Sequence, residues 1–179
     1  MDASIQFTHK DLVEGSKQGD GNSQKQLFNL YVDAMYNTAY RMMGNKEDAE
    51  DIVQEGFMDA FRYLSSFKYE SSFGAWLKRI VINKCINRLK VNKIEWEPFT
   101  ANTYQYAQEE PYVDDVPDVN KVMIGIGMLP IGYKQIISLY LIEGYDHQEI
   151  SEILGVAIST SKSQYHRAKK KLIKILKEL

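Results

Sequence analysis

Hydroxyl, amide and basic side chains follow one another between Ser159 and Lys177, where apolar residues recur at helical spacing. Hydroxyl and amide groups can hydrogen-bond to base edges in the major groove of DNA, and lysine and arginine can hold phosphates. Their combination on one helix is typical of a helix that reads duplex DNA. The alternative is an ordinary amphipathic helix whose lysines face water.

The residues before this helix fit a helix-turn-helix. Asp146 and Glu149 form a D-x-x-E start signal, in which each side chain can reach the free backbone N–H of the other residue. Gly155 stands where the first helix must end, because glycine adopts positive φ at little cost. Ser159 is expected to cap the second helix. The stretch therefore predicts a DNA-binding helix-turn-helix, with a plain helical hairpin as the alternative.

A second candidate for nucleic-acid binding is the stretch at residues 66–76, which is rich in serine and aromatic residues. It contains an expected loop at 68–72 and leads into a basic helix. Aromatic rings can stack on unpaired bases while cations follow the phosphates, as single-stranded DNA requires. Along one side of this helix Arg79, Asn83, Asn87 and Lys90 recur at steps of four, four and three. The loop and helix therefore predict a surface for opened DNA strands.

The aromatic residues near this loop also admit a structural interpretation. Phe67, Phe73 and Trp76 could close the core of a small helical domain, and for Phe73 and Trp76 this is the favoured interpretation. Tyr69 is expected to stay available for a ligand. Cys85 lies among apolar residues and is predicted to be a small buried hydrophobe.

Acidic residues crowd a third stretch, a helix that Asn45 is expected to cap. They are Glu47, Asp48, Glu50, Asp51, Glu55 and Asp59. The helix dipole favours carboxylates near a helix N-terminus, so part of this charge needs no further explanation. The remainder predicts either a solubilising face or a docking face for a basic partner, and the residues alone do not decide between them.

The periodic segments of the chain all have helical spacing, so the expected fold class is all-α, with two small helical domains joined by an acidic linker. The expected domains are residues 1–93, a linker at 94–120, and residues 121–179, which end in the helix-turn-helix. Other expected helices are 9–19, one capped by Ser23 that ends at Gly44, 120–128 and 131–143. The acidic linker could mimic nucleic acid and shield the DNA-binding surfaces of the free protein.

Composition narrows the class of protein. The net charge is −2, and a single cysteine rules out a disulfide within the chain and fits a reducing cytosol. Neither a signal peptide nor an apolar run of membrane-spanning length is visible, so a cytoplasmic protein is expected. The three histidines are scattered and no glycine-rich phosphate loop occurs. An enzyme is not expected, and no catalytic residue, metal ligand or cofactor is predicted.

Two segments together resemble a known family. The first carries DAEDIVQEGF at 48–57 and FKYESSFGAWLKRIVINK at 67–84, and the second carries EGYDHQEISEILGVAISTSKSQYHRAKKKL at 143–172. Their order and spacing resemble the extracytoplasmic-function (ECF) group of bacterial RNA polymerase sigma factors, over roughly 9–93 and 121–177. The resemblance implies a protein that binds RNA polymerase core, recognises and melts specific promoters, and initiates transcription.

The resemblance also implies roles for individual residues, position by position. Implied polymerase-binding residues are Asp48, Glu50, Asp51, Gln54, Glu55 and Phe57. Implied contacts to the minus-ten element are Lys68, Tyr69, Glu70, Ser71, Ser72, Arg79, Asn83, Lys84 and Asn87. Implied contacts to the minus-thirty-five element are Ser159, Thr160, Ser161, Lys162, Ser163, Gln164, His166, Arg167 and Lys170. For the acidic helix, the resemblance favours docking over a merely solubilising role.

The implied partners are the polymerase core, promoter DNA and an anti-sigma factor. The core would be bound through the clamp coiled coil of its largest subunit and through its flap. An anti-sigma factor in this family is often membrane-bound and would hold the chain at the inner membrane. No small-molecule substrate is implied.

Many relatives carry G-T-V-K-S-R-L on the reading helix, whereas this chain has S-T-S-K-S-Q-Y at residues 159–165. This departure predicts different base contacts within the same fold. A stand-alone helix-turn-helix regulator of duplex DNA is the alternative function. It would leave the acidic helix and the aromatic loop without a role.

Overall fold

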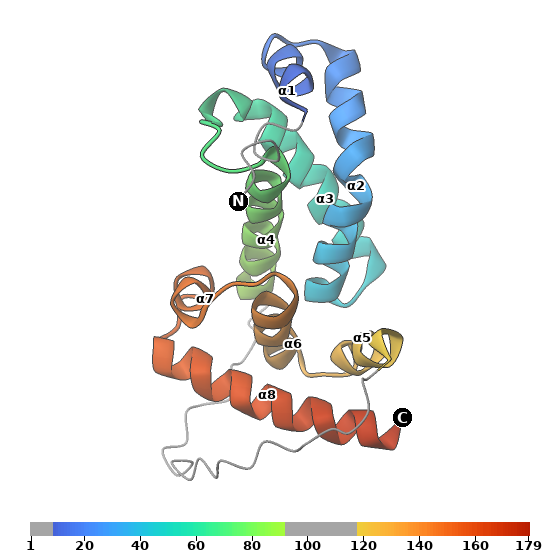
Figure 1. The fold of residues 1–179 in the computed structure, drawn as a ribbon, viewed down its shortest axis with the longest axis vertical. Helices are drawn as coiled ribbons and strands as arrows, with labels where there is room; N and C mark the ends of the chain where they lie inside the picture. The colour runs from blue at the N-terminus through green and yellow to red at the C-terminus, as the bar shows by residue number, and fades with distance from the viewer. Residues whose placement is uncertain (1–8, 92–117) are drawn as a thin grey trace. The chain divides into compact units, whose positions relative to one another are not determined.

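The computed structural model describes residues 9–91 and 118–179, and within these ranges all regular structure is helical (Figure 1). The predicted all-α class is therefore confirmed for the described residues. Backbone contacts divide the chain into two compact units, Met1–Asn92 and Lys93–Leu179. Nearly all of the expected linker at 94–120 lies outside the described residues. Among the described helices, none combines the length and the apolar character that crossing a bilayer requires.

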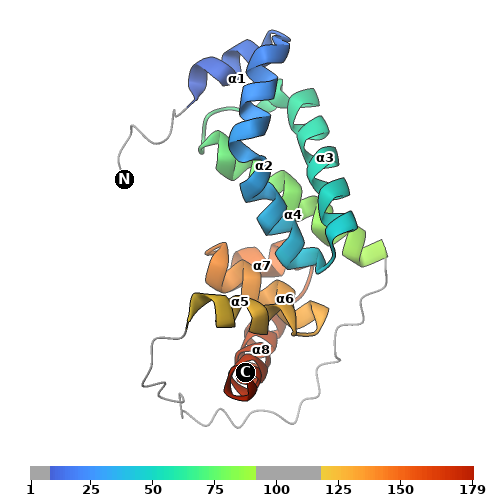
Figure 2. The same ribbon diagram turned by 90° about the vertical axis from the view of Figure 1, so that its right-hand side faces the viewer.

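The first unit contains a long helix, α2, against which the others are arranged (Figure 2). Its elements are α1 (Lys10–Lys17), α2 (Gly21–Met43), α3 (Lys46–Arg62), the 3-10 turn η1 (Leu64–Ser66) and α4 (Phe73–Val91). α2, α3 and α4 pack against one another, and α1 packs against α2 and η1. The chain between η1 and α4 therefore starts next to α1.

Local chemistry sets the ends of these helices. The side chain of Asp20 caps α2 by accepting from the backbone N–H of Ser23 at 3.0 Å. The prediction that Ser23 is the cap is wrong, because Ser23 lies in the first turn and donates its hydroxyl to Asp20. Gly44 ends α2 with a φ of 79°, as expected. Asn45 then caps α3 by accepting from the N–H of Asp48 at 2.8 Å, also as expected.

α3 and α4 approach closely at a buried glycine. A Cβ added to Gly56 would lie only 2.9 Å from Cγ2 of Val81, so a side chain at this position would push the helices apart. Ile52 and Leu77 are fully buried in the same unit. Cys85 is also fully buried, and burial raises the pKa of its thiol to about 12. This thiol is an inert packing group, as expected.

The second unit is built around the last helix, α8. Its elements are α5 (Val119–Gly127), α6 (Ile131–Ile137), the π-helical turn η2 (Ser138–Ile142), α7 (His147–Leu154) and α8 (Ile158–Glu178). α8 packs against α5, α6 and α7. The core residues that join them are Ile126, Leu129, Tyr133, Ile137, Ala168 and Leu172. The single helix expected over 131–143 is thus divided into α6 and η2.

The helix-turn-helix forms from α7 and α8 with the expected signals at three positions. Asp146 and Glu149 make both hydrogen bonds of a capping box, and Gly155 ends α7 with a φ of 70°. The prediction that Ser159 caps α8 is wrong: the cap is Ala157, and Ser159 is exposed within the first turn. The hydroxyl of Ser159 is therefore not used to start the helix.

We predict that replacing Gly56 by alanine and Val81 by alanine will have non-additive effects on stability. The methyl group added at Gly56 would meet Cγ2 of Val81, and the second substitution removes that atom. We expect the loss of unfolding free energy in the double variant to be about 1 kcal/mol smaller than the sum of the losses in the two single variants. The measurement is urea unfolding of the full chain. Strictly additive effects would contradict the close approach of α3 and α4.

Candidate nucleic-acid interfaces

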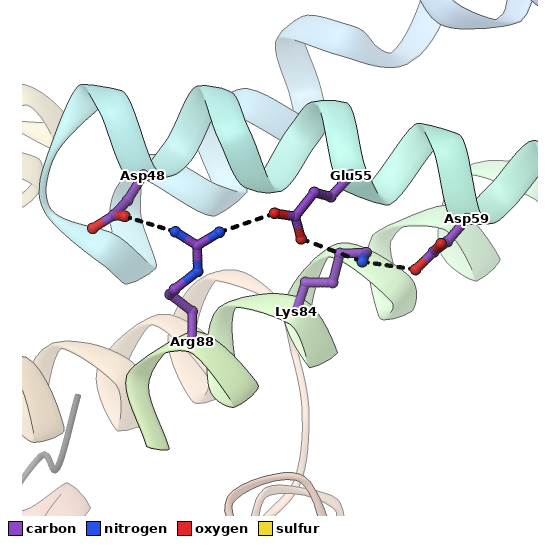
Figure 3. A network of polar contacts seen from close by, with 5 residues as sticks. All are labelled: Asp48, Glu55, Asp59, Lys84 and Arg88. Carbon is purple, nitrogen blue, oxygen red and sulfur yellow. Dashed lines mark hydrogen bonds and ion pairs between the residues drawn. The ribbon is translucent and has the colours of Figure 1, made fainter. Parts of the chain in front are cut away.

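Five charged side chains join α3 to α4 in one ion-pair ladder: Asp48, Glu55 and Asp59 from α3, and Lys84 and Arg88 from α4 (Figure 3). Nη1 of Arg88 lies 3.1 Å from Oδ1 of Asp48, and Nη2 lies 3.0 Å from Oε1 of Glu55. Nζ of Lys84 lies 2.7 Å from Oδ2 of Asp59 and 3.5 Å from Oε2 of Glu55. Glu55 therefore bridges the two cations.

Helical spacing produces this ladder. Residues four or seven positions apart share one face of a helix, so the three acids line the side of α3 that meets α4. Lys84 and Arg88 are four residues apart and face them in the same way. Burial lowers the pKa of Lys84, but its hydrogen bond and charge interaction with Asp59, together with Glu55, outweigh burial and raise it. Lys84 is therefore a cation held within the unit.

The ladder changes the interpretation of the acidic helix. Three of the helix's carboxylates form ion pairs with the two cations of α4. This role is neither solubilising nor docking. Lys84, expected to contact the minus-ten element, is ion-paired in this structure. Arg88 was missed as a functional residue, although its four-residue step from Lys84 could have suggested a shared face.

The outward face of α3 is formed by different residues. Glu47, Asp51, Gln54 and Met58 recur at steps of four, three and four, and all are exposed. Met58 was not expected here and is 61% exposed. Glu50 is also exposed and pairs with Lys46 at 3.6 Å. A polar face with one protruding apolar side chain could bind a basic partner protein.

Phe57 does not belong to this outward face. It is buried, and its ring lies 4.7 Å from the ring of Phe28 and 5.9 Å from that of Phe61. The expectation that Phe57 touches a partner directly is therefore corrected: it packs in the core behind the acidic face. Its apolar character and its place among Ile52 and Val53 on the helix are the sequence signal for this burial.

The polar side of α4 is open to solvent, as the spacing predicted. Arg79, Asn83, Asn87 and Lys90 are all exposed. Two amides between cations can hydrogen-bond to bases while the cations hold phosphates. In the loop before α4, Lys68 and Glu70 are exposed, and Ser71 and Ser72 are half-buried. Ser72 accepts from the N–H of Ala75 at 3.2 Å and so helps to start α4 near the predicted position.

Tyr69 is held by α1 and is not the open ring that the sequence suggested. Its hydroxyl donates a hydrogen bond to Glu14, and Nζ of Lys17 lies 4.5 Å from its ring centroid. The ring of Phe67 is 4.7 Å away. Burial and the hydrogen bond to Glu14 raise the pKa of Tyr69 to about 12, and the same hydrogen bond lowers the pKa of Glu14. The expectation that Tyr69 is available is therefore corrected.

The DNA-contact residues predicted on α8 lie partly on its surface and partly in the core. Exposed ones are Ser159, Lys162, His166 and Lys170; half-buried ones are Thr160, Ser163 and Arg167. Ser161 and Gln164 are buried, so neither is available to base edges in this structure. Oγ of Ser161 lies 3.0 Å from Nδ1 of His147, which explains how a polar side chain is accommodated between α7 and α8.

An aromatic cluster beside this contact was not foreseen. The rings of Tyr140 and His147 are stacked 4.7 Å apart, and the ring of Tyr165 lies 4.4 Å from Tyr140 and 5.6 Å from His147. Burial lowers the pKa of His147, and the nearby charge of Lys162 lowers it further. The cluster joins η2, α7 and α8, so it fixes the orientation of α8 relative to the other two elements. Its members come from three separate elements, so no local signal could have revealed it.

Within the described residues no group of three or more histidine, cysteine or acidic side chains is arranged to hold a metal ion.

Comparison with known proteins gives a consistent family. The chain matches the family model "Sigma-70 region 2" over residues 27–94 and "Sigma-70, region 4" over residues 125–172. ECF RNA polymerase sigma factor SigW of Bacillus subtilis is 31% identical, over 95% of this chain and 97% of its own length. The ECF RNA polymerase sigma-E factor of Haemophilus influenzae is 30% identical, over 92% and 93%.

A solved structure is also similar. It is the complex of the sigma factor RpoE with the anti-sigma factor NepR from Bartonella quintana. The TM-score is 0.56 at 25% identity, covering 86% of this chain and 96% of the other. The similarity therefore extends to both units.

We predict that Arg88→Ala will lower the free energy of unfolding by about 1 kcal/mol at low salt, because it removes two ion pairs that are only partly buried. The loss should shrink in 1 M NaCl, where the Debye length falls to about 3 Å. Lys90→Ala, an exposed cation on the same helix, is the control and should have little effect. Equal effects of the two substitutions at every salt concentration would contradict a stabilising ladder.

Proposed function

Because the chain belongs to the ECF group of RNA polymerase sigma factors, we propose that it binds the polymerase core, recognises and melts specific promoters, and so determines where RNA synthesis begins. One observation carries this proposal: the region 2 and region 4 matches fall on two units, and each unit has a helix with exposed basic and polar side chains. Sigma factors are DNA-binding initiation factors, so this chain would act by binding polymerase and promoter DNA. Its place of action would be the cytoplasm, where the polymerase transcribes.

Polymerase docking is proposed for the outward face of α3. Glu50, Asp51 and Gln54 would meet the basic groups of the clamp coiled coil, with the exposed Met58 adding an apolar contact. Asp48 and Glu55 would contribute less to docking, because both form ion pairs with Arg88. Electrostatic complementarity of this kind mainly sets the association rate and the choice of partner.

Contact with the minus-ten element is proposed for the loop at 68–72 and the exposed side of α4. Flipping or unstacking a base costs a few kcal/mol, which hydrogen bonds to the edge of the flipped base and contacts to the phosphates would have to offset. Arg79, Asn83 and Asn87 would bind the opened strand, and Lys68, Glu70, Ser71 and Ser72 would surround a flipped base. Lys84 could join them only after leaving Asp59 and Glu55.

Contact with the minus-thirty-five element is proposed for the N-terminal half of α8. Ser159, Thr160, Lys162, Ser163 and His166 would face the major groove. Arg167 and Lys170 would hold phosphates on the same side of the helix. The same unit would also dock on the polymerase flap. Base readout would thus depend on hydroxyl groups and on His166.

An anti-sigma factor is the proposed regulator. The Bartonella quintana protein, similar in fold and 25% identical, was solved in complex with one. A regulator that covers the docking face or the DNA-binding surfaces would keep the chain away from the polymerase, and a membrane-bound one would hold it at the inner membrane.

The proposed function is tested by transcription in vitro from a promoter library, with core polymerase alone and with core polymerase plus this protein. New, protein-dependent start sites are the expected result. Start sites identical to those of core polymerase alone would contradict the proposal. Specific binding of the protein to a duplex without polymerase would favour the stand-alone regulator instead.

We predict that Asp51→Lys will weaken binding to core polymerase about tenfold, a change that corresponds to about 1.4 kcal/mol. The charge reversal places a lysine against a basic partner surface. Asp33→Lys is the matched control, since Asp33 is an exposed acid on α2 of the same unit. Affinities would be measured by fluorescence anisotropy of the labelled full chain. Equal affinities of the two variants would exclude α3 as the docking helix.

We predict that Lys170→Ala will lower promoter affinity similarly for all sequences. The slope of log affinity against log salt concentration should fall by about one, the change expected from losing one phosphate contact. The measurement is binding of the polymerase complex to promoter duplex over a range of salt concentrations. Lys177→Ala, which alters an exposed lysine at the far end of α8, is the control. An unchanged slope for Lys170→Ala would rule out a phosphate contact there.

A further inference from the structure

We propose that Glu14 and Lys17 of α1 are positioning residues that set the base preference of the loop at 68–72, an inference that rests on the proposed function of that loop. Neither residue lies on the loop or on α4. The hydroxyl of Tyr69 donates to Oε1 of Glu14, 55 residues away in the sequence. Nζ of Lys17 lies 3.0 Å from the same carboxylate oxygen. α1 thus binds the centre of the loop through a shared carboxylate.

Lys17 holds the loop at two further points. Its Nζ lies 3.4 Å from the carbonyl oxygen of Phe67, to which it donates, and 4.5 Å from the ring centroid of Tyr69. A cation over a ring and a hydrogen bond to the adjacent backbone fix both the side chain and the chain path. The face of Tyr69 that Lys17 covers is not open to a base. Tyr69 is therefore a support for the loop, and its neighbours are the residues that can touch DNA.

The backbone of Tyr69 explains why support is needed. Tyr69 has a φ of 59°, and apart from His9 it is the only non-glycine residue with positive φ among the described residues. This conformation is unfavourable for a bulky residue and persists only where surrounding contacts impose it. It also sets the directions of Lys68 and Glu70, which flank Tyr69 and are exposed. If the contacts to α1 are lost, the loop can relax and present these two side chains differently.

α1 is separate from the proposed docking helix α3. The region 2 match begins at residue 27, whereas α1 ends at Lys17. The Glu14 and Lys17 contacts therefore reach the loop from outside the matched segment. Because Glu14 and Lys17 lie on α1 and not on α3, substituting them leaves the residues of the proposed docking face unaltered.

Three substitutions test the proposal in the full chain with core polymerase. Tyr69→Phe removes only the hydroxyl, Glu14→Ala removes the acceptor, and Glu14→Gln keeps an acceptor oxygen without the charge. Asp11→Ala, which alters an exposed acid on the same helix, is the control. Start-site use would be sequenced from a promoter library randomised across the minus-ten element, alongside polymerase affinity and thermal unfolding.

The expected result is a change of base preference at one or two positions, with discrimination falling about fivefold to tenfold for Tyr69→Phe and Glu14→Ala. The variant that combines Tyr69→Phe with Glu14→Ala should match either substitution alone. Glu14→Gln should retain most of the preference, and polymerase affinity should change less than twofold. Unchanged profiles in both Tyr69→Phe and Glu14→Ala, or a uniform loss of activity that follows a lowered unfolding temperature, would overturn the proposal. Absence of any start sites with the unaltered chain would instead overturn the proposed function and this inference with it.

Discussion

The ion-pair ladder between α3 and α4 is the interaction on which the first unit's two surfaces depend. Three carboxylates face two cations, and Glu55 contacts both cations. The buried Gly56 lets the two helices come close enough for these side chains to meet. Because paired groups are turned toward each other, the outward side of α3 remains acidic and the exposed side of α4 remains polar and basic. A single helix pair therefore presents two surfaces of opposite character.

This arrangement links the two proposed tasks through rigid packing. A partner bound to the acidic side of α3 would fix the position of α4, and with it Arg79, Asn83 and Asn87. The loop at 68–72 is fixed from another direction, by Glu14 and Lys17 of α1. In the second unit, the cluster of Tyr140, His147 and Tyr165 fixes the position of α8. In each case, side chains that are buried or paired hold in place an element whose other side chains form the polar surface.

Local signals in the sequence predicted much of the fold. Asn45, Gly44, Gly155 and the capping box at Asp146 all act where they were expected, because each works within a few residues of chain. The cap of α2 was misassigned because Asp20 and Ser23 are both good caps three residues apart. The periodicity of α4 likewise predicted its exposed side correctly.

Contacts between distant segments could not be predicted in the same way. Arg88 and Asp48 are 40 residues apart, and Tyr69 and Glu14 are 55 residues apart. Periodicity can show that such residues share a face of one helix, but it does not show which helix lies opposite. Ser161 and Gln164 were expected on the DNA surface because the family resemblance places them on the helix that reads the major groove. Both are buried once the unit is packed, and Ser161 contacts His147 of α7.

In the proposed function, the first unit holds opened strands while the second holds closed duplex of the same promoter. The most direct measurement is the fluorescence of 2-aminopurine placed in turn in the minus-ten and minus-thirty-five elements, on a promoter this protein uses with core polymerase. Unstacking should raise the signal at the minus-ten position alone, and only when protein and polymerase are both present. An equal rise at both elements, or none at either, would contradict this division of tasks.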